Sequence, residues 1–212
     1  MKILLIVPEV RMDEAPYTPA LWSGILGAIA EKKGAEVGLL DLNALRMNYS
    51  GNLIPLEKIE EEISTESWDL VGIGGLTTTY SRMKEIIPLI HKNSPNSIII
   101  AGGGWVTYNP DEIMQLIPEI DLTCIGEGEE TFSEVLDEIQ NKTYNFSNID
   151  GLCIRKEHEF EYTPPRALIS DLNQIPYPAY HLYENDIYFR YSSQPHSAES
   201  MNAKRRMAVV WE

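Results

Sequence analysis

Short apolar runs alternate with amphipathic segments along most of the chain. The runs at 70–73 and 98–101 are short, rich in β-branched residues and not alternating, which is typical of strands buried on both faces. The apolar runs together mark the strands. They predict strands at residues 3–7, 36–42, 70–74, 98–101 and 121–125. Apolar residues at helical spacing predict helices at residues 19–33, 55–63, 80–93, 111–116 and 126–139.

The alternation of strands and helices with short connections predicts an α/β fold. We expect a parallel sheet with helices on both faces and right-handed crossovers. Five strands favour the flavodoxin-like (Rossmann-like) order 2-1-3-4-5. In that order the topology reverses between the first and third strands, so a ligand crevice is expected over the loops that follow strands one, three and four.

Local signals add detail to two of the helices. In the first, Thr18 can act as the cap with Pro19 at the first position. Its apolar stripe, expected to face the core, consists of Leu21, Ile25, Ala28 and Ile29. In the third, Pro88 predicts a kink or a break.

The pattern changes near residue 142. Residues 1–142 are predicted to form the α/β domain, and residues 151–162 a β-hairpin. The low-periodicity stretch 171–194, rich in proline and tyrosine, is expected to be an ordered linker packed along a neighbouring surface. An apolar strand begins at 206–211, so we interpret residues 143–212 as a hairpin and linker leading to a domain beyond this sequence.

Glycine-rich turns stand where three of the predicted strands end. Glycine permits positive φ and lets a ligand approach the backbone closely. The glycines and their polar neighbours, with residues of the first loop, are the candidate cofactor-binding set. The set is Glu9, Val10, Tyr17, Gly74, Gly75, Leu76, Thr77, Thr78, Thr79, Gly102, Gly103, Gly104, Trp105, Thr107, Gly126, Glu127, Gly128 and Glu129. Alternatively, a threonine of this set caps the following helix, and Glu127 and Glu129 complement a helix dipole.

Composition excludes several classes of function. The 212 residues carry a net charge of −15, which argues against nucleic acid or an anionic membrane as a partner. No apolar run is long enough to span a membrane, and the N-terminus resembles a first strand more than a signal peptide, so we expect a cytoplasmic protein. The two cysteines, Cys124 and Cys153, fall in predicted strands and are expected to be buried, reduced thiols. We identify no catalytic residue and no metal-ligand spacing.

Three classes of ligand suit such a crevice. A dinucleotide would need a Gly-x-Gly-x-x-Gly motif after the first strand, but residues 8–11 contain no glycine. FMN would need a Ser/Thr-rich loop there, whereas the threonine cluster follows the third strand. The third class is cobalamin, whose nucleotide tail can enter the edge of a sheet. A stand-alone flavodoxin-like binding or interaction module, with FMN as one ligand, stays open as the alternative.

The ordered motifs resemble the N-terminal cobalamin-binding domain of cobalamin-dependent radical S-adenosylmethionine enzymes. That class includes methyltransferases and proteins similar to the anaerobic Mg-protoporphyrin monomethyl ester cyclase. The domain motifs are Gly74-x-Leu76-Thr77-x-Thr79, Gly102-Gly103-Gly104-Trp105-x-Thr107-x-x-Pro110 and Gly126-Glu127-Gly128-Glu129-x-Thr131. The linker motifs are Ile149-x-Gly151-Leu152 and Asp171-Leu172-x-x-Ile175-Pro176-x-Pro178-Ala179.

The resemblance implies a mode of cobalamin binding. None of the four histidines follows the Asp-x-His pattern of methionine synthase-type domains, so cobalamin is expected base-off with no histidine on cobalt. Gly74 stands where those domains usually have serine. A valine in place of Gly103 is expected to abolish binding while leaving the fold intact.

The resemblance also implies a missing catalytic part. The family cleaves S-adenosylmethionine with a 4Fe–4S cluster held by a Cys-x-x-x-Cys-x-x-Cys motif, which two separated cysteines cannot provide. The radical barrel, with S-adenosylmethionine and the cluster, is therefore expected in the parent enzyme only. The chain itself is expected to be the non-catalytic part that binds cobalamin for methyl transfer or ring-forming chemistry.

Overall fold

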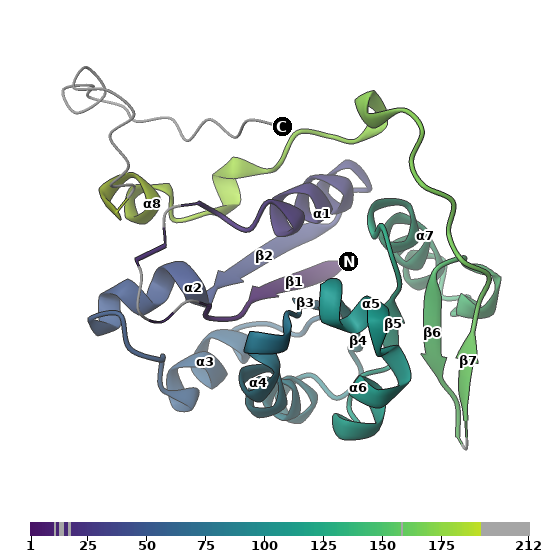
Figure 1. Ribbon diagram of the computed structural model, residues 1–212, viewed down its shortest axis with the longest axis horizontal. Coiled ribbons are helices and arrows are strands. Elements are labelled where there is room, and N and C mark those ends of the chain that lie inside the picture. Colours follow the sequence, from purple (N-terminus) through teal and green to yellow (C-terminus); the bar gives the residue numbers. More distant parts are fainter. Residues whose placement is uncertain (11, 13–14, 17, 158, 192–212) are drawn as a thin grey trace.

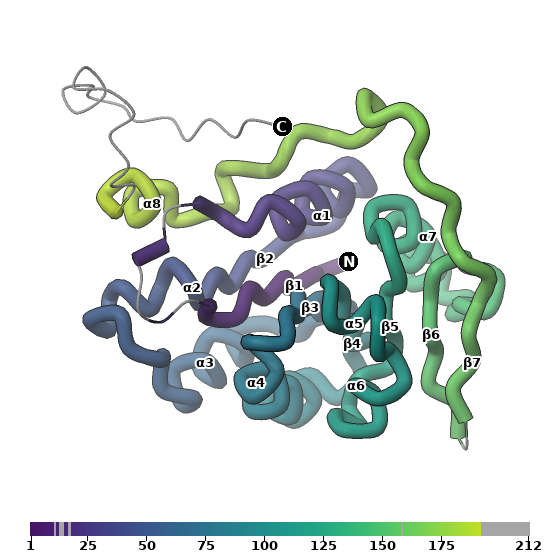
Figure 2. The backbone as a smooth tube through the Cα atoms, in the orientation of Figure 1, coloured from purple at the N-terminus to yellow at the C-terminus, as the bar shows by residue number. Residues whose placement is uncertain are grey.

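One mixed sheet with helices on both faces forms the centre of the computed structural model (Figure 1, Figure 2). The structure describes residues 1–10, 12, 15–16, 18–157 and 159–191. Within them the sheet has seven strands in the order β2-β1-β3-β4-β5-β6-β7. The strands are β1 (Lys2–Val7), β2 (Glu36–Asp41), β3 (Leu70–Gly74), β4 (Ile98–Gly102), β5 (Leu122–Cys124), β6 (Leu152–Arg155) and β7 (Phe160–Tyr162).

The first five strands confirm the predicted parallel order, but the sheet is larger than predicted. The predicted hairpin, β6 and β7, continues the same sheet, because β6 pairs antiparallel with β5 through Leu122 and Ile154. Its apolar residues Leu152 and Ile154 are buried and cover the outer edge of β5. The sheet therefore crosses the domain boundary expected at residue 142, and that boundary stays a prediction.

Helices cover the two faces unequally. On one face lie α1 (Leu21–Lys32) and α7 (Glu129–Gln140), which contact each other. The opposite face carries α3 (Leu56–Ile63), α4 (Tyr80–Asn93) and α6 (Pro110–Leu116). The remaining helical segments are α2 (Leu42–Leu45), η1 (Arg46–Tyr49), η2 (Thr77–Thr79), α5 (Gly104–Tyr108), η3 (Phe146–Asn148), η4 (Leu172–Gln174), η5 (Tyr180–Leu182) and α8 (Asn185–Tyr191).

Alternate residues of each central strand enter different cores, which explains why the apolar runs show no alternation. Leu4, Ile6 and Val71 pack under α3 and α4, whereas Ile3 and Leu5 pack under α1 and α7. All five are at most 4% exposed. A strand covered on both faces needs apolar residues at every position.

Three helical details differ from the sequence predictions. The helix α1 begins at Leu21 after Ala20 and has no side-chain cap, so Thr18 does not cap it. The helix α4 continues through Pro88, so the break is absent, and the kink at Pro88 stays a prediction. The five-residue helix α5 follows the glycines of β4 directly and is not among the helices predicted from the sequence.

The linker packs along α7 and α1, as expected. Arg166 donates from Nε to Thr131 Oγ1 at 3.0 Å and from Nη1 to Glu134 Oε1 at 3.1 Å, both on α7. Farther along, the hydroxyl of Tyr183 donates to the carbonyl of Ala20 at 2.7 Å, just before α1. In Figure 2 this segment runs from β7 across α1 to α8. The strand predicted at 206–211 lies outside the described residues.

The linker ends on a buried polar contact between α8 and β2. The hydroxyl of Tyr188 donates to the carboxylate of Asp41. Both side chains are buried, and burial raises the pKa of Asp41. The contact therefore fixes α8 against the sheet at the end of β2.

Removing the Tyr188 hydroxyl should loosen α8. In Tyr188→Phe the buried carboxylate of Asp41 loses a donor, which should cost about 1–3 kcal/mol of local stability. Hydrogen exchange at the α8 amides should accelerate accordingly, whereas Tyr180→Phe, at an exposed linker tyrosine, should leave it unchanged. Equal exchange in the two variants would contradict this role for Tyr188.

Candidate functional site

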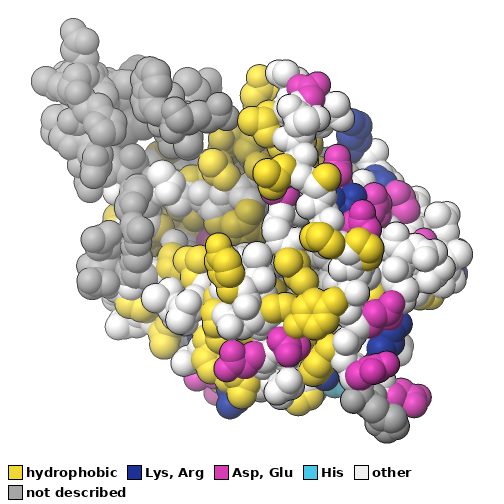
Figure 3. Space-filling view, turned by 45° about the vertical axis from the view of Figure 1, so that its right-hand side comes forward, with side chains coloured by type: hydrophobic (Ala, Val, Ile, Leu, Met, Phe, Trp, Pro, Cys, Tyr) yellow, Lys and Arg dark blue, Asp and Glu magenta, His cyan; other side chains and the backbone are white. Residues whose placement is uncertain are grey.

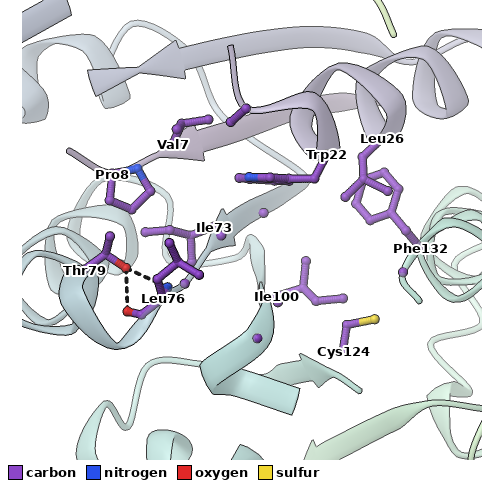
Figure 4. A pocket seen from close by; sticks show the side chains of 18 of the residues that line it. Val7, Pro8, Trp22, Leu26, Ile73, Leu76, Thr79, Ile100, Cys124 and Phe132 are labelled. Carbon is purple, nitrogen blue, oxygen red and sulfur yellow. Dashed lines mark hydrogen bonds between the residues drawn. The ribbon is translucent and has the colours of Figure 1, made fainter. Parts of the chain in front are cut away.

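A cavity of about 580 Å³ opens at the carboxyl ends of β1, β3, β4 and β5, under α1 and α7 (Figure 4). It lies over the loops after strands one, three and four, where the crevice was predicted. Its lining combines glycine turns with apolar side chains. It consists of Val7, Pro8, Val10, Thr18, Pro19, Ala20, Trp22, Leu26, Asn43, Gly72, Ile73, Gly74, Gly75, Leu76, Thr79, Ile100, Gly102, Gly103, Gly104, Cys124, Gly126, Glu127, Gly128, Glu129 and Phe132.

The floor of the cavity is made of glycines on two neighbouring strands. Gly72 and Gly74 of β3 alternate onto the face that α1 covers, and Gly102 of β4 is paired with Gly74. A Cβ on Gly74 would lie 2.3 Å from Cζ2 of Trp22, whereas a Cβ on Gly102 would have its nearest neighbour, Cys124 Cβ, at 3.8 Å. The Trp22 ring therefore fills the space above Gly74, and the missing side chain at Gly102 leaves the space in which a ligand can lie against the sheet.

Two other glycines serve backbone packing. The amide of Gly75 donates to the carbonyl of Gly102 at 2.7 Å, which joins the turns after β3 and β4. Gly103 has a φ of +111°, and a Cβ there would lie 2.4 Å from the carbonyl oxygen of Gly75. The expectation that Gly103→Val would spare the fold is therefore wrong, because the new side chain would meet backbone and not open space.

Apolar side chains from the helices and strands form the walls. Trp22 and Leu26 extend from α1, Phe132 from α7 and Ile100 from β4, and Cys124 lies beside them (Figure 4). Burial raises the pKa of the Cys124 thiol to about 11, and the nearby Glu129 adds to the effect. The thiol is thus neutral at physiological pH and acts as a small apolar group. Both cysteines are free and buried, as predicted.

Within the threonine cluster after β3, the side chain of Thr79 holds its own turn. The buried Oγ1 of Thr79 accepts from the amide of Leu76 and donates to its carbonyl, both at 2.9 Å. This pair of hydrogen bonds closes the turn above the cavity. Thr77 and Thr78 are exposed and do not line the cavity.

Three more candidate residues lie outside the lining and support its loops. The carboxylate of Glu9 forms a buried ion pair with Arg82. Arg82 Nε donates to Glu9 Oε2 and Arg82 Nη2 donates to Glu9 Oε1, both at 2.9 Å. Trp105 packs edge-to-face on Tyr80 with ring centroids 4.7 Å apart. Thr107 Oγ1 accepts from the amide of Gly126 at 3.2 Å. Tyr17 lies outside the described residues.

The turn after β5 connects the cavity to the linker. Gly126 has a φ of +83° and opens the loop before α7. Glu127 lines the cavity, and its Oε2 accepts from the amide of Ile169 in the linker at 2.7 Å. Glu129 begins α7 and also lines the cavity, so it lies at the positive end of the helix dipole. Glu127 thus fixes the linker at one edge of the cavity.

The sequence predicted the glycine turns of the cavity but not most of the side chains that form its walls. Lining residues outside the candidate set include Trp22, Leu26, Ile100, Cys124 and Phe132. Only one signal pointed to them: Trp22 and Leu26 are four residues apart, so they share a face of α1. Their apolar character was indistinguishable from that of core residues.

The described residues meet neither the requirements of a metal site nor those of a membrane-spanning helix. They hold no group of three His, Cys, Asp or Glu side chains that could bind a metal ion. Among the helices described, none is both long and apolar enough to cross a membrane. Hydrophobic side chains gather in the middle of the face displayed in Figure 3, with acidic and basic side chains mostly toward its edges.

A family model described as the B12 binding domain matches residues 14–136. The match includes α1, the glycine turns and most of α7, which together line the cavity. The chain therefore belongs to the family of B12 binding domains. This family membership favours cobalamin over the FMN alternative.

Curated relatives are longer proteins. An uncharacterized methyltransferase of Pyrococcus horikoshii is 28% identical over 192 residues, which are 89% of this chain and 40% of that protein. The anaerobic magnesium-protoporphyrin IX monomethyl ester cyclase of Synechocystis is 29% identical over 104 residues, covering 49% of this chain and 21% of the cyclase. The chain thus spans less than half the length of either relative.

Solved structures of cobalamin-dependent enzymes share the fold. The radical enzyme OxsB, with aqua-cobalamin and S-adenosylmethionine bound, superposes with a TM-score of 0.74 at 19% identity over 90% of this chain and 25% of OxsB. The radical methyltransferase TsrM of Kitasatospora setae, with cobalamin and a 4Fe–4S cluster bound, gives 0.64 at 22% identity over 83% of this chain and 31% of TsrM.

Proposed function

We propose that this chain binds cobalamin with its nucleotide base displaced from cobalt, and that the nucleotide tail enters the cavity under α1 and α7. The observation that carries the proposal is the cavity itself, with glycines as its floor and Trp22, Leu26 and Phe132 as its walls. A flat, largely apolar base suits such a slot, because it loses little on leaving water.

The chain's own groups would hold the rest of the cofactor. Backbone amides at the glycine turns and at the start of α7 are donors for the phosphate and amide groups of the cofactor. The apolar walls would exclude water from the base. When bound, cobalamin supplies a cobalt centre that can carry a methyl group.

The lining of the cavity supports the part of the proposal in which no histidine binds cobalt. None of the described residues that line the cavity is a histidine. His91 is exposed at the end of α4, and His181 lies 2.7 Å from Glu31 on the outer side of α1. The neutral Cys124 thiol is a poor metal ligand.

We further propose that the chain is the cofactor-binding part of a radical S-adenosylmethionine enzyme. The relatives above are named as methyltransferases and a cyclase, so methyl transfer and ring formation are the two reactions proposed for the longer protein. The chain has only two cysteines, both buried, so S-adenosylmethionine and the iron–sulfur cluster are assigned to a barrel outside these 212 residues.

Titration with hydroxocobalamin tests the binding proposal. We expect a base-off absorption spectrum in the bound state, with a dissociation constant of about tens of micromolar or tighter. An equal concentration of FMN should not displace the cofactor. A bound cofactor with the base-on spectrum, or no binding at these concentrations, would overturn the proposal.

A further inference from the structure

Trp22 occupies a position in the cavity that no sequence motif marked. It lies in the first turn of α1, half-buried, and its ring extends from the helix into the cavity (Figure 4). A Cβ on Gly74 would lie 2.3 Å from Cζ2 and 2.7 Å from Cε2 of this ring. The ring therefore rests directly on the glycine floor, in the space that a side chain at position 74 would fill.

The indole nitrogen of Trp22 is a donor without an acceptor. Within residues 1–10, 12, 15–16, 18–157 and 159–191, no hydrogen bond from its Nε1 is present. Two other half-buried indoles pack on the opposite face: Trp68 donates to the carbonyl of Ile63 at 2.8 Å, whereas Trp105 packs on Tyr80 and has no indole hydrogen bond within the described residues. The Trp22 nitrogen is not among the buried side-chain atoms that lack a partner, so it is open to the cavity and can donate to an acceptor on a ligand.

The surroundings of Trp22 fix its helix before any ligand arrives. The linker hydroxyl of Tyr183 donates to the carbonyl of Ala20 at 2.7 Å and lies 2.9 Å from Ser23 Oγ. Gly24 leaves room for this contact, because a Cβ there would lie 2.8 Å from the Tyr183 oxygen. The first turn of α1 is thus held by the linker from outside, which preorganises the ring that it presents to the cavity.

We propose that Trp22 is the residue that binds the nucleotide tail of the cofactor, with its ring packed on the aromatic base and its indole N–H donated to an oxygen of the sugar-phosphate. This inference rests on the proposed function and adds the contact that distinguishes cobamides with a nucleotide tail from those without one. Trp22 combines a flat apolar face with an N–H donor, and it lines the same cavity as Leu26 and Phe132.

Comparison of cobalamin with cobinamide, which lacks the nucleotide tail, tests the role of Trp22. In Trp22→Phe the 212-residue chain keeps an aromatic ring but loses the donor, so cobalamin should bind about five- to tenfold more weakly. Cobinamide affinity should not change, because cobinamide has no tail for Trp22 to contact. The matched control Trp68→Phe, on the opposite face, should leave both affinities unchanged.

A second variant moves the ring without replacing it. Gly74→Ala places a methyl group where the Trp22 ring lies, so it should also weaken cobalamin selectively. Circular dichroism establishes that each variant is folded. If both folded variants retain wild-type affinity for cobalamin, or lose affinity for cobinamide to the same extent, the inference fails. If the wild-type chain itself binds cobalamin base-on or not at all, the proposed function fails instead.

Discussion

Replacing Gly102 by valine should abolish cobalamin binding while leaving the protein folded. The new side chain would enter the cavity floor, where the nearest atom to its Cβ is Cys124 Cβ at 3.8 Å. The backbone of Gly102 is not in the positive-φ region, and valine is well suited to the end of a strand. Blocking the slot should weaken binding by about 100-fold or more, equivalent to about 3 kcal/mol.

The adjacent Gly103 provides the contrasting variant. In Gly103→Val the side chain would meet the backbone of Gly75 and would have to adopt a φ of +111°, which a β-branched residue rarely does. We expect this variant to lose both its thermal stability and its binding, whereas Gly102→Val keeps a melting temperature within about 2 °C of the wild type. Retained cobalamin binding in folded Gly102→Val would mean that the cavity is not the cofactor site.

Glu9→Gln should cause a large loss of stability without changing the lining of the cavity. The change leaves Arg82, only 7% exposed, without its buried carboxylate partner. Burial alone lowers the pKa of Arg82, but the hydrogen bonds to Glu9 and Glu85 outweigh it and raise the pKa overall. Breaking a buried pair on one side costs about 3–5 kcal/mol, so the melting temperature should fall by roughly 10 °C.

Glu85 offers a control on the same arginine. It lies 2.9 Å from Arg82 Nη1, but its side chain is 50% exposed, so Glu85→Gln should cost less than about 1 kcal/mol. Replacing both members of the buried pair, as in Glu9→Leu with Arg82→Met, should recover part of the loss. Urea unfolding measures all three free energies. A loss below about 1 kcal/mol in Glu9→Gln would contradict the structural role assigned to Glu9.

The strand order could be predicted from the sequence because buried parallel strands have continuous β-branched runs. The run 98–101 is an example, since Ile99 and Ile100 are both buried but belong to different cores. The addition of β6 to β5 could not be predicted, because no periodicity marks which edge a hairpin joins. The helix α5 is too short for a recognisable apolar stripe.

The buried face of α1 differs from the face that its apolar residues predict. The predicted stripe of Leu21, Ile25, Ala28 and Ile29 is only partly buried, whereas Ser23, Gly24, Gly27 and Ala30 are buried. The reason is that the linker packs on this helix as well as the sheet does, and small residues let Pro178, Leu182 and Tyr183 approach. Contacts made by a segment some 150 residues later leave no local pattern.

The roles of the glycines in the candidate site also depend on residues that are distant in the sequence. Three consecutive glycines at 102–104 predicted a close approach of some kind, but not which glycine meets which neighbour. In the structure Gly102 borders open space, Gly103 meets the Gly75 backbone, and a Cβ on Gly104 would meet no atom within 4 Å. These three roles follow from the way the turn after β3 packs against the turn after β4.

Electron paramagnetic resonance of the bound cob(II)alamin distinguishes a cobalt without a nitrogen ligand from one that carries such a ligand on its lower face. The unpaired electron on cobalt couples to a nitrogen ligand on the lower axial position and splits the signal when such a ligand is present. A base-off cofactor with its tail in the cavity and no histidine on cobalt predicts a bound signal without nitrogen splitting. A nitrogen-split signal from the bound cofactor would contradict the account.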